Sequence, residues 1–231
     1  MPACSRNCNK RMKRVFQTLT LALVAVMCLS ACSETNDEVE EYPDWINKNE
    51  AFFASKYTAA KQAIASGSKE WKVIKSYARD PEIEGTYTDY IVVKVLREGT
   101  GSGCPLFTDT VRVHYRGQLI ASATHVDSKD PELGMIFDQS WGTDEFNERV
   151  SVPMKFAVST VVDGFSTALQ HMHIGDRWLV YIPYQLGYGT QGTSGIQGYS
   201  TLVFDIALSA YYRVGVKVPD WQSNKGLLWE E

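Results

Sequence analysis

One stretch, residues 161–189, constrains the fold of this chain more than any other, because it joins a helix pattern, a strand pattern and a glycine-rich loop. Apolar residues recur at steps of three and four over residues 161–172, which predicts a helix of about three turns with one apolar face. We expect Asp163 to cap this helix and Gly175 to end it. β-branched and aromatic residues then alternate over 178–182, which predicts a strand covered on both faces.

Further strand patterns lie on either side of this stretch, and no internal repeat is visible. They occur at residues 71–77, 90–98, 109–120, 152–158 and 201–210. The connections between them are too short for helical crossovers between parallel strands, so the order of elements indicates an antiparallel sheet. We therefore expect an α+β domain over residues 89–212, in which an antiparallel half-barrel sheet wraps around one short central helix.

The first 31 residues have the features of a secretory signal. Five basic residues precede an apolar run from Val15 to Leu29, which is shorter than a membrane-spanning helix and contains polar side chains. The run ends in Leu-Ser-Ala-Cys at residues 29–32, which resembles the lipobox of bacterial lipoproteins. This resemblance implies cleavage before Cys32 and a lipid on its thiol, which would anchor the protein in the cell envelope, at the outer membrane, on the periplasmic or the surface side. The alternative is an ordinary signal in which Cys32 is incidental.

Residues 32–42 are acidic and poor in apolar side chains, which predicts a solvated tether. An acidic run directly after a lipidated cysteine resembles the surface-export signal of some Bacteroidetes lipoproteins; an extended linker is the alternative. Without the signal, the chain holds 18 basic and 27 acidic residues, a net charge of −9. Such a surface repels phosphate backbones, so we expect no binding to nucleic acid.

Cysteine usage leaves one thiol in the mature domain. Cys104 is the only cysteine after residue 32, so no intramolecular disulfide can form. We interpret Cys104 as a small apolar residue without a catalytic role, because no histidine pairing is suggested nearby in the sequence.

A second helix is expected over residues 43–66, within an N-terminal segment (43–88) that also contains a connecting strand. Pro43 at its start and Gly67 past its end fit the usual asymmetry of helix termini. The helix carries enough aromatic surface to need a partner, which is either its own domain or a second copy in a dimer. Residues 213–231 form a tail without an assigned role.

Eight short stretches, spread over about 120 residues, carry a family pattern: 94–101, 111–117, 137–140, 153–156, 161–165, 172–178, 187–189 and 201–205. In this order they resemble the FKBP-type peptidyl-prolyl isomerases. The resemblance implies the FKBP fold and activity on proline-containing polypeptides.

The resemblance also assigns roles to matching positions. It implies catalytic roles for Phe137, Asp138 and Tyr188, with Tyr188 at the rim of a pocket and Asp138 beside it. It implies that the substrate is bound by residues on the pocket walls, its floor and the last loop: Tyr115, Met154, Val161, Val162, Phe165, Ile196 and Phe204. Without the resemblance, Tyr115, Phe137 and Phe204 would be interpreted as core aromatics, and Asp138 as a hydrogen-bonding residue at a loop end.

The chemistry of prolyl isomerisation suits these residue types. Rotation about a peptide bond faces a barrier of about 18–20 kcal/mol, since the C–N bond has double-bond character. No bond breaks, so neither a nucleophile nor a metal nor another cofactor is required. An aromatic pocket can accept the proline ring and remove the water that stabilises the planar amide.

Three departures from the family pattern favour a second hypothesis, a non-catalytic peptide-binding or assembly module at the cell envelope. Phe165 stands where the family commonly has tryptophan, Met154 stands where an aromatic is frequent, and Gln197 replaces a proline. Two polar loops, 123–134 and 141–151, are longer than in minimal members and could cover the pocket or bind a partner.

Other functions fit less well. The glycines at 187–192 match a dinucleotide-binding pattern, but no helix pattern follows them. His171 and His173 are two residues apart on a predicted helix, so they should point to different sides and not share a metal. No serine or cysteine lies in a nucleophile motif, which disfavours a hydrolase.

Overall fold

The computed structural model of the 231-residue chain describes residues 39–221. From Glu40 on, the described residues belong to one compact unit. The expected signal 1–31, the lipidation of Cys32 and the end of the expected tail, 222–231, lie outside the described residues. No helix within 39–221 has the length and apolar character that crossing a membrane requires.

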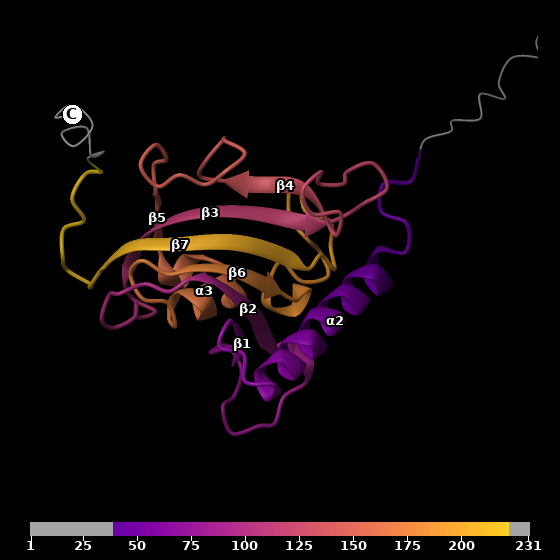
Figure 1. Cartoon of the computed structure of the whole chain (residues 1–231), viewed down its shortest axis with the longest axis horizontal. Coiled ribbons are helices and arrows are strands. Elements are labelled where there is room, and N and C mark those ends of the chain that lie inside the picture. Colours follow the sequence, from indigo (N-terminus) through magenta and orange to yellow (C-terminus); the bar gives the residue numbers. More distant parts are fainter. Residues whose placement is uncertain (1–38, 222–231) are drawn as a thin grey trace, which may run out of the picture. The chain divides into compact units, whose positions relative to one another are not determined.

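Antiparallel pairing joins seven strands into one sheet, in the order β1-β2-β6-β7-β3-β4, with β5 also paired to β3. The strands are β1 (Trp71–Lys75), β2 (Tyr90–Arg97), β3 (Thr110–Ile120), β4 (Leu133–Gln139), β5 (Met154–Ala157), β6 (Arg177–Ile182) and β7 (Leu202–Tyr212). Figure 1 shows β3 and β7 side by side as the two long strands of the sheet. The expected α+β class and antiparallel sheet are confirmed.

The two short strands β4 and β5 share one edge of β3. β5 pairs with residues 110–113 of β3, and β4 pairs with residues 116–120. Tyr115 therefore lies between the two paired stretches, at a point where the sheet splits. The segment 140–153 runs from one short strand to the other.

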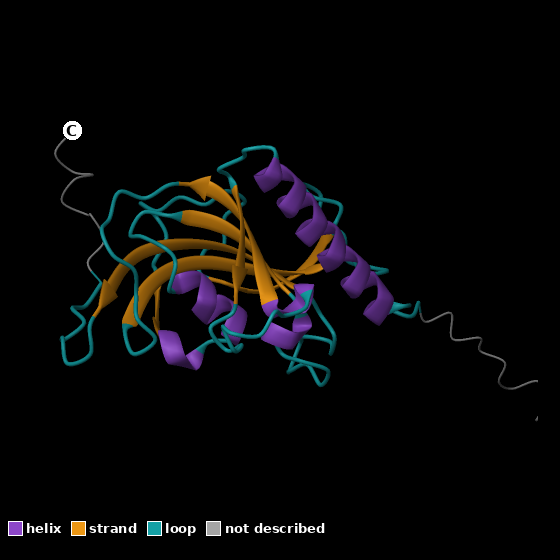
Figure 2. Ribbon diagram, turned by 90° about the horizontal axis from the view of Figure 1, so that it is seen from below, coloured by secondary structure: helices purple, strands orange, loops and turns teal. Residues whose placement is uncertain are grey.

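A helix covers each face of the sheet. Successive side chains of a strand point to opposite sides, so neighbouring residues of one strand pack against different helices. Val180 of β6 belongs to the core that surrounds α3 (Asp163–Leu169). Its neighbour Tyr181 belongs to a second cluster, with Phe53 of α2 (Trp45–Ala65). Figure 2 shows the long α2 and the short helices on different sides of the curved strands. The expectation that this strand is covered on both faces is confirmed.

The central helix is shorter than the sequence predicts, and both of its expected ends are wrong. Val162 occupies the N-cap position, no side chain caps the helix, and Asp163 is its first residue. The helix ends at Leu169, whereas Gly175 lies in the later turn before β6 with φ +95°. Tight turns follow the helix and still bring Met172 into the core, fully buried. The apolar period therefore continues beyond the α-helical hydrogen bonds.

A glycine brings α3 unusually close to the sheet. A Cβ at Gly164 would lie 2.4 Å from Cγ2 of Ile182, which is closer than side chains pack. The residue after it, Phe165, is consequently held under the sheet with only 3% of its surface exposed. α3 thus serves as a platform that fixes Phe165.

The N-terminal helix α2 packs on its own domain. Phe53 and Ala60 are buried against the face of the sheet that carries Val92 and Tyr181. Gly67 follows the helix end with φ +88°, as expected. The aromatic surface of α2 therefore finds a partner within the chain, and a dimer through this helix stays a prediction.

The tether is shorter than the sequence predicts, because its last two residues pack on the domain. The carboxylate of Glu41 accepts hydrogen bonds from Ser122 and Thr124 and contacts His125, and these bonds lower its pKa to about 2. The ring of Tyr42 meets that of Trp45 edge-on at 4.7 Å. An acidic residue that finds several donors behaves as part of the fold and not as solvated linker.

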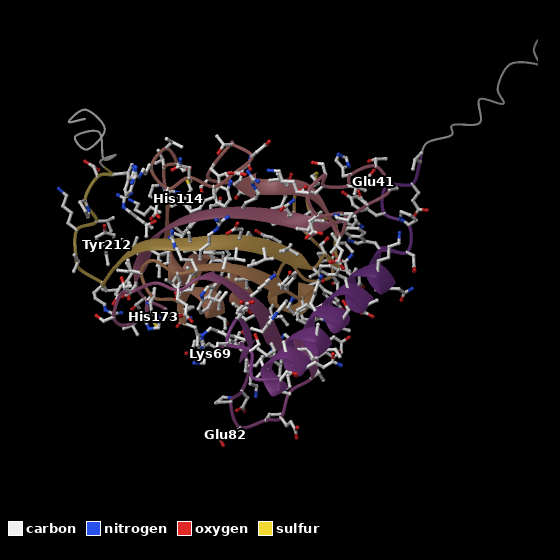
Figure 3. The ribbon with its side chains drawn as sticks, viewed as in Figure 1. Glu41, Lys69, Glu82, His114, His173 and Tyr212 are labelled. Atoms are coloured by element: carbon white, nitrogen blue, oxygen red, sulfur yellow. The ribbon has the colours of Figure 1, made fainter. Side chains whose placement is uncertain are left out.

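Loop 141–151 and the described part of the tail cover the outer face of β3. His114, labelled in Figure 3, is fully buried and lies 5.1 Å from the ring of Phe146. Arg112 donates a hydrogen bond to the carbonyl of Pro219 and lies 5.7 Å from the centre of the Trp221 ring. Residues of the tail up to Trp221 therefore pack back on the domain.

Candidate active site

A cavity of about 510 Å³ opens beside the split between β4 and β5. Most of its lining comes from β4, from the segment before α3 and from the loop after β6. The lining residues are Tyr115, Met135, Ile136, Phe137, Asp138, Phe156, Thr160, Val161, Val162, Phe165, Tyr188, Thr193, Ser194, Gly195, Ile196 and Phe204. A volume of this size and an apolar, aromatic lining are typical of sites that bind small molecules or single side chains.

Edge-to-face aromatic contacts fix the walls and floor of the cavity. Phe204 of β7 lies 5.4 Å from Phe137 and 4.9 Å from Phe165, with interplanar angles of 90° and 85°. Tyr115 meets Phe165 at 89° and 6.1 Å, and it meets Phe156 at 5.5 Å. Rings in this arrangement hold each other in place and leave a rigid apolar surface.

A glycine makes room for two of these rings. A Cβ at Gly117 would lie 2.5 Å from Cζ of Phe137 and 2.6 Å from Cε1 of Phe204. No side chain larger than hydrogen fits there unless both rings move. The glycine in the middle of β3 is therefore part of the architecture of the cavity.

Tyr115 and Asp138 provide the polar part of the wall. The Tyr115 hydroxyl donates a hydrogen bond of 2.6 Å to Oδ2 of Asp138, and the Gln139 N–H donates to Oδ1 at 2.9 Å. Burial, together with the hydrogen bond to Asp138, raises the pKa of Tyr115 well above 10. The phenol stays protonated at neutral pH and remains a donor to the carboxylate.

Tyr188 stands at the rim with 39% of its surface exposed. Burial of its hydroxyl and the charge of Asp138 raise the pKa of Tyr188, so this phenol also keeps its proton. Within residues 39–221 its hydroxyl has no hydrogen-bond partner. It can therefore donate to a group that enters the cavity.

The sequence predicted ten pocket residues, and the structure brings nine of them together around this cavity. They are Tyr115, Phe137, Asp138, Val161, Val162, Phe165, Tyr188, Ile196 and Phe204. Their functional roles stay predictions.

The placement of Met154 in the pocket is wrong. Met154 is 44% exposed on β5 and does not line the cavity. Phe156, two residues on and on the same face of the strand, packs against Tyr115 and takes that position. The alternation of β5 could have indicated Phe156.

The two polar loops do not cover the cavity. No residue of 123–134 or 141–151 lines it, whereas residues 193–196 of the loop after β6 do. Met135 and Ile136 of β4 and Thr160 also line it, and sequence reasoning did not single them out. Strand β4 begins inside the first predicted loop, at Leu133, and its lining of the cavity starts at Met135.

The structure brings a histidine to Cys104, which the sequence did not suggest. Nε2 of His173 lies 3.8 Å from the sulfur. Burial and the charge of Asp176 raise the pKa of the Cys104 thiol, however, so the thiol stays protonated at neutral pH and is a poor nucleophile. The arrangement does not resemble an activated Cys-His pair.

Known proteins are similar to this chain over the part that forms the cavity. Residues 105–209 match the family described as FKBP-type peptidyl-prolyl cis-trans isomerase. The chain is 37% identical over 119 residues to the macrophage infectivity potentiator of Trypanosoma cruzi, an alignment that covers 51% of each protein. It is 36% identical over 116 residues to the FKBP-type 22 kDa peptidyl-prolyl cis-trans isomerase of Escherichia coli, covering 50% of this chain and 47% of the relative.

Among solved structures, a peptidyl-prolyl cis-trans isomerase from Pseudomonas syringae is 26% identical, with a TM-score of 0.43, covering 69% of this chain and 96% of that one. The chain spans about half the length of the curated relatives it matches. Every residue that lines the cavity falls inside the matched segment 105–209. The segment 105–209, which contains the whole lining of the cavity, therefore belongs to the FKBP-type peptidyl-prolyl cis-trans isomerase family.

Proposed function

We propose that the domain catalyses cis-trans isomerisation of X-Pro peptide bonds in exported polypeptides. The observation that carries this proposal is the aromatic cavity, which combines a rigid apolar wall with protonated tyrosine hydroxyls and falls wholly within the family match. Two relatives from Escherichia coli are named as FKBP-type peptidyl-prolyl cis-trans isomerases. No cofactor is needed, because the reaction forms and breaks no covalent bond.

In the proposed mechanism the proline ring enters between Phe137 and Phe204, above Phe165. The cavity removes water from the amide, which loses the solvation that favours its planar form. The Tyr188 hydroxyl holds one carbonyl that flanks the bond, and the Val162 N–H, which has no backbone acceptor within the described residues, holds another. Each 1.4 kcal/mol removed from the barrier raises the rate about tenfold.

Asp138 acts in this mechanism through Tyr115. Its carboxylate fixes the Tyr115 hydroxyl at the wall and places a negative charge beside the twisting amide. As the C–N bond twists, its nitrogen becomes more pyramidal and its carbonyl oxygen loses partial negative charge. The fixed negative charge at this wall therefore repels that oxygen less in the twisted form and favours it.

A second candidate is a module that binds proline peptides without turnover. Phe165 favours it, because a phenyl ring offers less surface beneath the proline than the tryptophan that is common in the family. Both functions predict binding, and only the first predicts acceleration of isomerisation.

A protease-coupled assay on a proline-containing peptide tests the proposal. We expect the wild type to accelerate isomerisation and Phe137→Ala to lose most of that activity while it stays folded. Phe107→Ala is the matched control, since Phe107 is 55% exposed and lies outside the cavity. No acceleration by a folded wild type at micromolar concentration would exclude catalysis and leave the binding module.

We further propose a location in the cell envelope, with a lipid on Cys32 as the anchor. A relative that is 35% identical over 116 residues is named as an outer membrane protein of Legionella longbeachae. Labelling with a fatty acid in wild type and Cys32→Ala tests the anchor. Label that survives the substitution would rule out lipidation at Cys32.

A further inference from the structure

We propose that helix α2, which lies outside the family match, is a positioning element of the cavity: it holds both stems of the loop 187–200. This loop supplies Tyr188 and residues 193–196 to the cavity. Three residues on the first two turns of α2 make the contacts. The inference deepens the proposed isomerase function and rests on it for its kinetic consequences.

The C-terminal stem of the loop, at residues 200–201, is fixed by two buried contacts with α2. Nε1 of Trp45 donates a hydrogen bond of 3.0 Å to Oγ of Ser200, which in turn donates at 2.5 Å to the carbonyl of Gln197. One helical turn later, Oδ1 of Asn49 accepts a 2.7 Å hydrogen bond from the N–H of Thr201. Trp45, Asn49, Ser200 and Thr201 are each at most 5% exposed.

The N-terminal stem of the loop, which begins at Tyr184, contacts Glu50, the next residue of α2. The hydroxyl of Tyr184 donates to Oε1 of Glu50 at 3.4 Å. Tyr184 opens the short 3-10 helix 184–186 that leads directly to Tyr188. Its ring also lies 5.0 Å from that of Tyr199, so the two stems touch each other as well as α2.

The buried amide of Asn49 indicates that these contacts position the loop and do not only stabilise the fold. A fully buried amide is costly unless its polar atoms are paired, and apolar packing would serve stability as well. Here its oxygen takes the Thr201 N–H and its nitrogen donates to the carbonyl of Trp45 at 2.8 Å. The amide therefore specifies one register between the helix and the loop.

Close backbone contacts hold the loop together, so both its order and its orientation depend on its stems. A Cβ at Gly198 would lie 2.1 Å from the carbonyl oxygen of Thr190, and one at Gly192 would lie 2.2 Å from that of Ile196. Thr193 and Ile196 also form a bridge, in which the backbone nitrogen of each lies 3.0 Å from the carbonyl oxygen of the other. A shift at the stems therefore moves Ile196 as part of one body, and small displacements of binding groups reduce catalysis strongly.

The test uses Trp45→Phe and Ser200→Ala, singly and together. Phenylalanine keeps an aromatic ring in the core but removes the indole N–H donor together with part of the ring volume, whereas Ser200→Ala removes the acceptor with little change in volume. Lys48→Ala, on the exposed side of the same helical turn, is the matched control. The measurements are KM and kcat for a proline peptide, amide hydrogen exchange of residues 187–200, and the dissociation constant of a proline peptide.

Each single variant should raise KM and the dissociation constant about fivefold, the size of effect that the loss of one hydrogen bond of ordinary strength produces. Exchange of amides in 187–200 should increase, while exchange in β6 and β7 stays as in wild type. The effects of the two substitutions should be less than additive in the double variant, because both remove the hydrogen bond between Trp45 and Ser200.

Unchanged exchange in 187–200 for both single variants, or equal loss of protection throughout the sheet, would overturn the positioning role. If the wild type binds the peptide without turnover, the proposed catalysis fails, whereas exchange and binding still decide the role of α2.

Discussion

Replacing His114 by phenylalanine is expected to make the fold less sensitive to acid. The imidazole is fully buried beneath the loop 141–151, and neither ring nitrogen has a hydrogen-bond partner among the described residues. Burial lowers the pKa of His114 below its ordinary value of 6.5, and the charge of Glu148 offsets part of this effect. Phenylalanine keeps a ring against Phe146 and removes the titrating group.

The size of the effect follows from the difference in proton binding between the two states. Because the pKa of His114 is lower in the folded protein, the unfolded chain binds the proton more readily. Stability is therefore complete above the unfolded pKa of about 6.5 and falls by up to about 1.4 kcal/mol for each pH unit below it. Down to pH 5 the upper limit is about 2 kcal/mol, or about 4–8 °C in Tm for a domain of this size.

Thermal unfolding of wild type and His114→Phe at about pH 7.5 and about pH 5 measures this difference. We expect acidification to lower the Tm of the wild type more than that of the variant. The other titrating groups are present in both proteins and cancel in the comparison. His173→Phe is the matched control, because it makes the same substitution at a histidine on the surface. Equal acid sensitivity of wild type and His114→Phe would refute the reasoning.

Three further predictions concern the cavity. Tyr115→Phe removes the donor to Asp138 and should lower kcat/KM about tenfold with the fold intact by circular dichroism, since hydrogen bonds to charged groups contribute about 1.5–3 kcal/mol; full activity would remove this bond from the mechanism. Gly117→Ala drives a Cβ into Phe137 and Phe204 and should weaken the binding of a proline peptide in a titration while destabilising the domain by about 1–3 kcal/mol. Unchanged binding there would mean that the two rings can move freely. Phe156→Ala should lower kcat/KM, whereas Met154→Ala should not, and the reverse outcome would restore Met154 to the site.

Local periodicity was enough to predict most of the fold. Strands such as β6 and β7 alternate or carry unbroken apolar runs, and their burial follows that pattern. The ends of α3 could not be predicted this way, because turns after Leu169 keep the apolar spacing and still bury Met172. Hydrophobic periodicity reports which side faces the core and not which hydrogen bonds the backbone makes.

The site was predictable where a residue type and a strand position coincide, as at Tyr115 and Phe204. Met154 was misplaced because either Met154 or Phe156, on the same face of β5, could line the cavity. Packing against Tyr115 selects Phe156, and the sequence does not show that contact. Contacts between distant segments left no local signal. The proximity of His173 to Cys104 and the hydrogen bond between Trp45 and Ser200 each join residues far apart in the chain.

Exchange NMR on a proline peptide mixed with a small amount of this protein tests catalysis in the aromatic cavity most directly. The method reports cis-trans interconversion at equilibrium without a coupling protease, and spectra of the labelled protein show where the peptide binds. We expect faster exchange, with shift changes at Phe137, Tyr188 and Phe204, and loss of the acceleration in Phe137→Ala. Shift changes at these residues without any acceleration would contradict catalysis, and shift changes elsewhere would contradict the site.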